Sequence, residues 1–297
     1  MAKKIYVTLS GGLGNQLHTL AAAYCVAKIK SQKIVLLLPR GTKATSLRRN
    51  EKDITSFDIH ELPLGIVTSL GPNDGVRKKL IRHILRGYSS VSKKLFPRTH
   101  LRLEELETDA YSSKIRLQEP RFMQDHYENA FFPVVAREFG FPLRFNLIEM
   151  SQNFRNLEQS LRLPNRKTVI GVHIRLGDFR TWNNGTFMLD SQYYLENLRS
   201  IMVRFPNSQV WVFSDEPEEA AEMLGSEFEL LEVSRSFDLT NAEELALLSR
   251  VDAILASRST FSWWACYWKD IQSNIWYPDL NLCLDGWTHS LRKVETA

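Results

Sequence analysis

The chain of 297 residues is 43% hydrophobic and 24% charged, and its formal net charge is only +4. This composition predicts a sizeable core, and the length favours two domains of ordinary size. The small net charge gives no indication of nucleic-acid binding, and no apolar run reaches the roughly 18 residues that a membrane-spanning helix needs.

The basic N-terminus leads directly into a strand pattern, without the long apolar core of a signal peptide, so we expect a cytoplasmic protein. The three cysteines, Cys25, Cys266 and Cys283, are too few and too scattered for a disulfide framework. No CxxC or HExxH motif is present. We therefore expect reduced thiols and no metal site.

The first forty residues predict a β-loop-α-β unit. Residues 3–10 form an apolar strand pattern, residues 11–15 a glycine-rich break, residues 16–30 an alanine-rich buried helix and residues 33–39 a second strand. From about residue 40 to 150 the pattern is irregular and contains six prolines. Few elements are predicted there.

Regular alternation returns after residue 167. The sequence predicts strands at 168–175, 209–214, 228–233 and 252–257, and helices at 190–205, 216–224, 241–251 and 259–268. Strands that alternate with helices predict parallel sheets packed between helices. Because a polar stretch near residues 150–167 separates the two alternating runs, we predict the α/β class with two domains, residues 1–155 and 156–297.

The stretch from residue 75 to 102 contains no acidic residue, and its apolar positions 80, 81, 84 and 85 share one helical face. Two interpretations are open: a solvated helix on an ordinary domain, and peripheral membrane contact through Arg77 to Arg102. Nucleic acid is a weaker third candidate, because no interleaved aromatics or recognition motif accompany the charges.

Charged residues follow the strand predicted at 168–175. In open parallel sheets, ligands bind beyond the carboxyl ends of the strands, so GVHIRLGDFR, residues 171–180, ends where chemistry is expected. The guanidinium of Arg175 emerges from an apolar strand, and its planar donors suit a phosphate. An ion pair with Asp178 or another carboxylate explains Arg175 equally well, and Asp178 after a glycine is also typical of a turn.

Two further segments could approach the same ligand. A helix that begins at Ser259 and Thr260 carries free N–H groups and a partial positive charge, and Ser262 adds a hydroxyl. The tryptophans at 263, 264 and 268 are expected to pack in the core. Asp215, in FSDEP at a strand end, is either a site residue or part of a helix cap.

The loop GGLGNQ, residues 11–16, lets the backbone approach a ligand closely. It is a weak dinucleotide fingerprint, because Leu17 replaces the third glycine and no acidic residue ends the second strand. The Walker Lys-Ser/Thr pair is missing too. A nicotinamide cofactor and ATP are therefore poor candidates.

Three motifs together resemble the bacterial and animal α-1,2-fucosyltransferases, glycosyltransferase family 11. They are GGLGNQL at 11–17, HIRLGDF at 173–179 and STFSWWA at 259–265, and they stand in the family's order and approximate spacing, with residues 40–150 unmatched. The resemblance implies a GT-B fold of two facing Rossmann-like domains with a cleft between them, acceptor-side first and donor-binding second. It also implies an inverting enzyme that uses GDP-fucose and needs no metal or other cofactor.

The resemblance implies site residues as well. Arg175 corresponds to the arginine that binds the donor diphosphate, and His173 lies beside the nucleotide. The segment Ser259, Thr260, Phe261 and Ser262 lines the diphosphate pocket. The remaining donor-site residues that it implies are Gly12, Gly14, Asn15, Asp215 and Glu244.

Two positions depart from the family pattern. A second arginine usually follows the first, where this chain has Leu176, and an aromatic residue and Gln usually follow the glycine motif, where His18 and Thr19 stand. The first change removes one candidate phosphate contact. The second could mark a different donor sugar or acceptor.

In such a reaction, fixed positive groups stabilise the charge that builds on the departing GDP. Arg175 and the segment 259–262 are the candidates. A base collects the acceptor proton, with Asp178 the first candidate and His18 the second. The expected acceptor is a galactose-terminated glycan, lipid-linked O-antigen or capsule, at the inner face of the bacterial membrane. The alternatives are a transferase of another GDP-deoxysugar and a catalytically silent sugar-nucleotide-binding protein.

Overall fold

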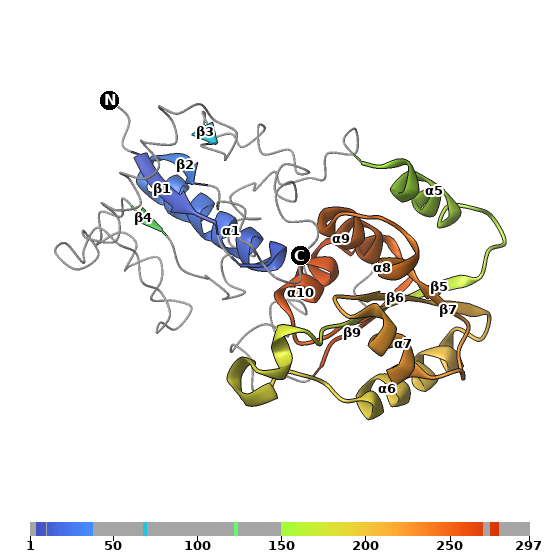
Figure 1. The fold of residues 1–297 in the computed structure, drawn as a ribbon. Coiled ribbons are helices and arrows are strands. Elements are labelled where there is room, and N and C mark those ends of the chain that lie inside the picture. The colour runs from blue at the N-terminus through green and yellow to red at the C-terminus, as the bar shows by residue number, and fades with distance from the viewer. Residues whose placement is uncertain are drawn as a thin grey trace. The chain divides into compact units, whose positions relative to one another are not determined.

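The structure, a computed structural model, describes residues 4–9, 11–37, 68–69, 122–123, 150–269 and 274–278. The chain divides into two compact units, Met1–Arg144 and Phe145–Ala297 (Figure 1). The basic stretch predicted at 75–102 lies outside the described residues. No helix in the described ranges combines the length and apolar character needed to cross a bilayer.

The described residues of unit 1 form a parallel sheet in the order β3-β2-β1-β4 and a long helix. The strands are β1 (Lys4–Thr8), β2 (Lys33–Leu37), β3 (Thr68–Ser69) and β4 (Phe122–Met123), and the helix is α1 (Leu13–Lys30). Because α1 is apolar on nearly all sides, it is buried along most of its length. It ends at Ser31, which adopts the left-handed conformation with φ 52°.

Unit 2 contains a five-stranded, all-parallel sheet in the order β7-β6-β5-β8-β9. The strands are β5 (Thr168–Ile174), β6 (Ser208–Ser214), β7 (Leu230–Glu232), β8 (Ala253–Leu255) and β9 (Ile275–Trp276). The chain moves outward from β5 to β7 and then returns to place β8 on the other side of β5. Between β5 and β8 the strand order therefore reverses, and such a point opens a crevice for a ligand.

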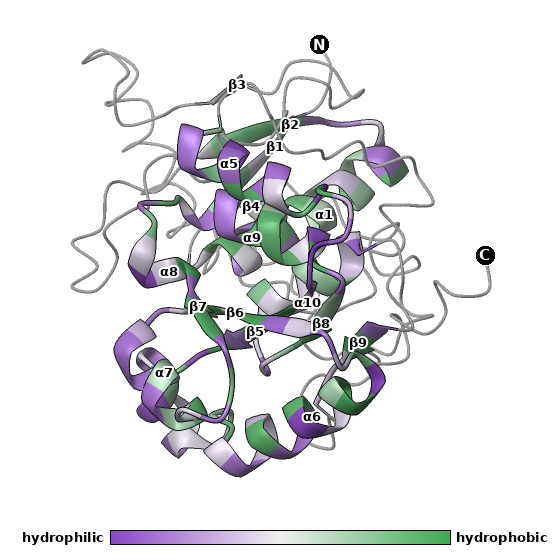
Figure 2. Ribbon diagram, turned by 90° about the vertical axis from the view of Figure 1, so that its right-hand side faces the viewer, coloured by the Kyte–Doolittle hydropathy of each residue, from purple (hydrophilic) through white to green (hydrophobic). Residues whose placement is uncertain are grey.

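Helices cover both faces of this sheet, α6 (Ser191–Arg204) and α7 (Pro217–Leu224) on one face, α9 (Asn241–Arg250) and α10 (Thr260–Trp268) on the other (Figures 1 and 2). Alternate residues of β5 point to opposite faces. Ile170, Val172 and Ile174 pack in the core shared with α6 and α7. On the other face α9 packs so closely that a Cβ on Gly171 would lie 2.7 Å from Leu248 Cδ1.

Most elements predicted for the second half are confirmed, with three differences. The strand expected at 228–233 is shorter, because α8 (Val233–Ser236) begins at its last residue. The two-residue strand β9 was not predicted. The polar stretch near 150–167 holds a helix, α5 (Gln152–Ser160), which Ser151 caps by accepting a hydrogen bond from Phe154 N–H. The predicted boundary at residue 155 falls inside this helix, and α5 lies wholly in unit 2.

Trp263 and Trp264 have no exposed surface, which confirms the prediction that they pack in the core. Trp263 stacks on Tyr267, and Trp264 contacts Trp268 in a tilted arrangement along α10. The described cysteines, Cys25 and Cys266, are buried free thiols. The first turn of α10 thus stands on a fixed aromatic base, which positions its polar N-terminus.

Candidate functional site

Two polar segments meet at the carboxyl edge of the unit 2 sheet, on either side of the β5–β8 reversal. The end of β5 carries His173, with Arg175 directly after the strand, and the segment after β8 carries Ser257, Ser259 and Ser262. The neighbouring strands bring them together, since Val172 pairs with Leu255 in the parallel register. The crevice rule for parallel sheets therefore selects this place as the candidate ligand site.

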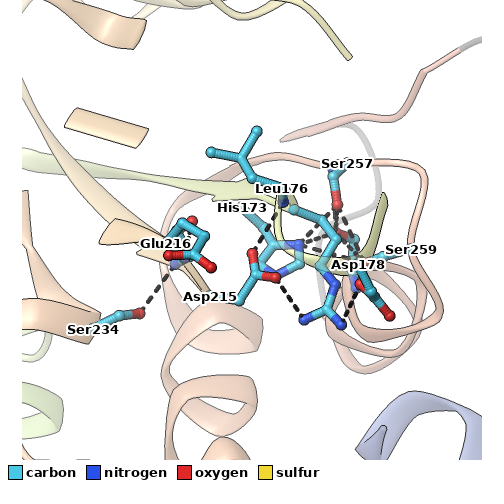
Figure 3. Close-up of polar contacts among 11 residues, drawn as sticks. His173, Leu176, Asp178, Asp215, Glu216, Ser234, Ser257 and Ser259 are labelled. Atoms are coloured by element: carbon cyan, nitrogen blue, oxygen red, sulfur yellow. Dashed lines mark hydrogen bonds and ion pairs between the residues drawn. The ribbon is translucent and has the colours of Figure 1, made fainter. Parts of the chain in front are cut away.

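A cluster of three serines holds His173 on this edge (Figure 3). His173 Nδ1 lies 2.6 Å from Ser262 Oγ and 2.9 Å from Ser257 Oγ. Ser259 is the N-cap of α10, and its Oγ accepts from Ser262 N–H at 3.1 Å. These contacts fix the start of α10 against the end of β5.

The hydrogen-bond roles in this cluster follow from Ser262. Its hydroxyl oxygen accepts from Ser257 N–H at 3.1 Å and from the Ser259 hydroxyl at 3.2 Å. With both acceptor positions occupied, its one proton is available for Nδ1 of His173, the shortest contact. This assignment of donors favours the tautomer of His173 that carries its proton on Nε2.

His173 is neutral at physiological pH. Burial, and to a smaller extent the nearby charge of Arg175, together lower its pKa from 6.5 to about 3. Phe261 stacks on the imidazole with ring centroids 4.9 Å apart. His173 therefore places a neutral, immobilised imidazole at the site and adds no charge to it.

Arg175 lies at the end of β5 with two carboxylates on its N–H edges. One terminal nitrogen, Nη2, is 2.8 Å from Asp178 Oδ1, and the other, Nη1, is 3.1 Å from Asp215 Oδ2. The two partners differ in burial, since the Asp178 side chain is 66% exposed and that of Asp215 only 16%. Arg175 thus has one well-held partner and one that an incoming anion can readily replace.

Asp215 does not cap a helix, so that interpretation of FSDEP is wrong for this residue. Its Oδ1 accepts from Leu176 N–H at 3.0 Å while Oδ2 pairs with Arg175. Glu216 takes the N-cap position of α7 instead, and its N–H donates to Ser214 Oγ. Gly177 makes room for Asp215, because a Cβ there would lie 2.5 Å from Asp215 Oδ2.

Leu176 points away from this polar edge. Its side chain is 1% exposed and belongs to the core formed with Leu189, Tyr194 and the apolar residues of β5. The side chain at this position therefore stabilises unit 2. A charged group there would have to enter the core or reorganise the loop.

Glu244 lies in the first turn of α9, which begins at the carboxyl edge because the helix connects two parallel strands. Its side chain is buried, with 7% of its surface exposed. The neighbouring Glu243, and not Glu244, caps the helix in a capping box with Thr240. Capping therefore does not account for Glu244.

The glycine-rich loop of unit 1 precedes α1. Gly11 has φ 76°, a conformation that favours glycine, and the exposed Gly12 is the N-cap of α1. Gly14 is buried and Asn15 half-buried in the first turn. His18 is fully buried, its Nδ1 lies 3.0 Å from Gly14 O, and burial lowers its pKa to about 4. This burial speaks against His18 as the base.

Two residues of this edge were not predicted from the sequence. Ser257 binds His173, and Arg258 follows it in the β8–α10 loop, where its guanidinium donates to Thr186 O at 3.1 Å. In the described ranges, no carboxylate lies within salt-bridge distance of Arg258. Three serines around one strand end were the available signal for Ser257. Nothing in the local sequence distinguishes Arg258 from a surface arginine.

The described residues contain no group of three His, Cys, Asp or Glu side chains that could hold a metal ion. The charged groups described at this edge include Arg175, Arg258, Glu244 and the carboxylates that face Arg175. The arrangement offers guanidinium donors, hydroxyls and a helix N-terminus to an anion.

Comparison with known proteins identifies the family. The profile of glycosyl transferase family 11 matches residues 90–275, more than half of the chain. The chain belongs to glycosyl transferase family 11. This family member is 25% identical to an α-1,2-colitosyltransferase of Escherichia coli over 91% of its own length and 89% of that protein. It is 22% identical to the O-antigen biosynthesis glycosyltransferase WbnK of Escherichia coli over 95% of its length and 99% of that protein.

A structural comparison gives the same fold. The crystal structure of the NodZ α-1,6-fucosyltransferase soaked with GDP-fucose, an enzyme of Bradyrhizobium, matches with a TM-score of 0.50 and 14% identity. The match covers 89% of this family 11 chain and 92% of that chain. The α/β class and the Rossmann-like units of the GT-B type, predicted from the sequence, are thereby confirmed.

Proposed function

We propose that this chain is an inverting, metal-independent glycosyltransferase that moves L-fucose from GDP-fucose to the 2-hydroxyl of a galactoside. The observation that carries the proposal is Arg175, which stands at the β5–β8 reversal opposite the hydroxyl-lined start of α10 in a family 11 chain. Unit 2 would bind the donor, and unit 1 would provide the acceptor side.

The diphosphate would lie between Arg175 and the N-terminus of α10. The partial positive charge at the N-terminus of α10 and the Thr260 hydroxyl would favour an anion. Arg258 follows the same strand end and would supply a second cation, in place of the arginine that the family usually has at position 176. Glu244 would contact the guanine, because a carboxylate can accept hydrogen bonds from the guanine N–H groups.

Donor binding requires a change of partners at Arg175. A phosphate oxygen takes the position of the exposed Asp178 carboxylate, while the less exposed Asp215 continues to hold the guanidinium. Asp178 is then released close to the reacting centre. This exchange frees a carboxylate for proton transfer at the moment when the donor is bound.

The reaction is a displacement at the anomeric carbon. The acceptor oxygen attacks this carbon, the bond from carbon to phosphate oxygen breaks, and its electron pair leaves with GDP. The acceptor proton moves to Asp178. Arg175, Arg258 and the α10 amides stabilise the negative charge that accumulates on GDP, which is the main source of acceleration in such a site.

The similarity to a colitosyltransferase favours a second candidate donor, GDP-linked colitose. Colitose differs from fucose by the loss of one hydroxyl group. A site that hydrogen-bonds this hydroxyl would reject colitose strongly, whereas an apolar pocket would discriminate weakly. The donor sugar therefore has to be identified by experiment.

The test is transfer from GDP-fucose, GDP-colitose, GDP-mannose and UDP-galactose to methyl β-galactoside, with EDTA present. Mass spectrometry identifies the added sugar, and proton NMR gives the linkage and anomeric configuration of the product. We expect α-1,2-linked fucose at an undiminished rate in EDTA. Exclusive use of GDP-colitose would show that colitose, and not fucose, is the sugar transferred. Loss of activity in EDTA that a divalent metal restores would contradict metal independence.

A further inference from the structure

The loop after β5 carries an aromatic cluster, Phe179, Trp182 and Phe187, that the donor site does not use. The loop contains two short 3-10 turns, η5 (Asp178–Arg180) and η6 (Trp182–Gly185). Trp182 stacks on Phe187 with centroids 4.4 Å apart, and Phe179 lies 5.6 Å from Trp182 and 6.2 Å from Phe187. The loop thus brings together three rings whose spacing in the sequence matches neither a helix nor a strand.

The cluster has a buried base and an exposed top. Phe179 is 9% exposed, whereas Trp182 is 48% exposed. Single exposed apolar residues are common and need no explanation. Here, however, the exposed indole is held in a stacked pair, so it presents a flat apolar face in a fixed orientation.

The second half of this loop is tied down by hydrogen bonds. Arg258 of the β8–α10 loop donates to Thr186 O at 3.1 Å, and Asp190 caps α6 by accepting from Tyr193 N–H at 2.9 Å. Within the loop, Met188 N–H donates to Gly185 O at 3.0 Å, and Gly185 has φ 76°. These bonds hold the part of the loop around Phe187 in place.

The cluster borders the face of Arg175, while the anion site borders its edges. The Arg175 guanidinium carbon lies 5.7 Å from the centroid of Phe179, in cation–π contact. The N–H edges of the same guanidinium meet Asp178 and Asp215. A diphosphate bound at the N–H edges of Arg175 would therefore leave the aromatic cluster available to a different ligand beside the reacting carbon.

We propose that the aromatic cluster is a stacking platform for a sugar ring of the acceptor glycan, with Trp182 as its main contact. This proposal rests on the proposed function, because a transferase must hold a second saccharide next to its donor. A pyranose ring has an apolar C–H face that packs on an indole, and its hydroxyl edge stays available for hydrogen bonds. The platform adds an acceptor contact from the donor-binding unit.

The experiment separates acceptor binding from donor binding. Trp182→Ala, Trp182→Phe and Phe187→Leu are compared with Val203→Ala, a control at an 84% exposed apolar position on α6. Acceptor KM is measured by mass-spectrometric transfer, and GDP affinity by calorimetry. We expect Trp182→Ala to raise acceptor KM about tenfold with GDP affinity unchanged, and Trp182→Phe to keep most of the binding.

A second measurement does not depend on transfer. Saturation-transfer NMR with methyl glycosides of galactose, glucose, mannose and their N-acetylamino analogues should show ring-proton contact that Trp182→Ala abolishes and Val203→Ala keeps. The proposal is overturned if no glycoside shows contact that depends on Trp182, or if Trp182→Ala weakens GDP and acceptor equally. Failure of the proposed function would appear separately, as a wild-type protein that binds no GDP and uses no donor.

Discussion

The exchange of partners at Arg175 makes Asp178→Asn an informative substitution. Asp178 occupies one edge of the guanidinium, with Oδ1 2.8 Å from Arg175 Nη2. Asparagine keeps the size of the side chain and removes its charge. If a diphosphate must replace Asp178, the substitution removes a competitor, so GDP should bind at least as tightly as it does to the wild-type protein.

The expected gain is small because the Asp178 side chain is 66% exposed. Exposed ion pairs contribute about 0.2–1 kcal/mol, and 1.4 kcal/mol corresponds to a factor of ten in affinity. The dissociation constant of GDP should therefore fall by a factor of about 1.5 to 5. Transfer should change in the opposite direction, by about 100-fold or more, because the acceptor loses its base.

Calorimetric titration with GDP and initial-rate kinetics with a saturating donor measure the two effects. Glu219→Gln is the matched control, because Glu219 pairs with Arg180 on the same loop. It should leave both quantities unchanged. The reasoning is refuted if Asp178→Asn weakens GDP binding tenfold, since Asp178 would then hold the donor, or if transfer continues at the wild-type rate, since Asp178 would then not be the base.

Three further predictions concern the surroundings of Arg175. Leu176→Ala should lower the free energy of unfolding by about 2–5 kcal/mol in urea titrations, whereas Leu163→Ala, at a 55% exposed position, should change it by less than about 0.5 kcal/mol; equal effects would contradict the burial of Leu176. Ser262→Ala leaves Ser257 N–H and the Ser259 hydroxyl without their acceptor, so it should cost about 1–3 kcal/mol, and the exposed Ser200→Ala is its control. The pKa of His173 is about 3 in the folded chain and near 6.5 when unfolded, so the unfolded state binds more protons as pH falls through this window, and the free energy of unfolding should decrease by up to about 1.4 kcal/mol per pH unit. Between pH 7 and pH 5, His173→Asn should lose less free energy of unfolding than the wild-type protein. Equal losses would exclude His173 as the titrating group.

The regular part of unit 2 could be predicted because its sequence carries strong periodic patterns. Strands β5 and β6 are each seven residues long, rich in apolar residues and buried over most of their length, and α9 places buried residues at nearly every position. The helix α5 was missed because only Phe154 and Leu157 of its nine residues are buried, too few to show a helical period. The two residues of β9 carry no pattern at all.

The site could be predicted only in its local parts. HIRLGD and STFS mark two strand ends, and parallel topology brings them together. The role of Asp215 depends on Leu176 N–H, 39 residues earlier in the chain, and no local pattern distinguishes this bond from a helix cap. The burial of His18 was readable in principle, because a helix that is apolar on all sides is buried. The aromatic cluster could not be predicted, because its three rings lie on an irregular loop without a periodic sequence pattern.

The central claim is that Arg175 meets the negative charge that develops on GDP. The most direct test compares the rate of fucosyl transfer by the wild-type protein, Arg175→Ala and Arg180→Ala, with folding of each verified by urea titration. Arg180 is the matched control, because it lies on the same loop and pairs with Glu219. We predict that Arg175→Ala lowers kcat/KM by about 100- to 1,000-fold, the usual loss for one donor to a developing anion, and that Arg180→Ala stays within about threefold of the wild-type value. A folded Arg175→Ala protein that transfers fucose as fast as Arg180→Ala would contradict the account.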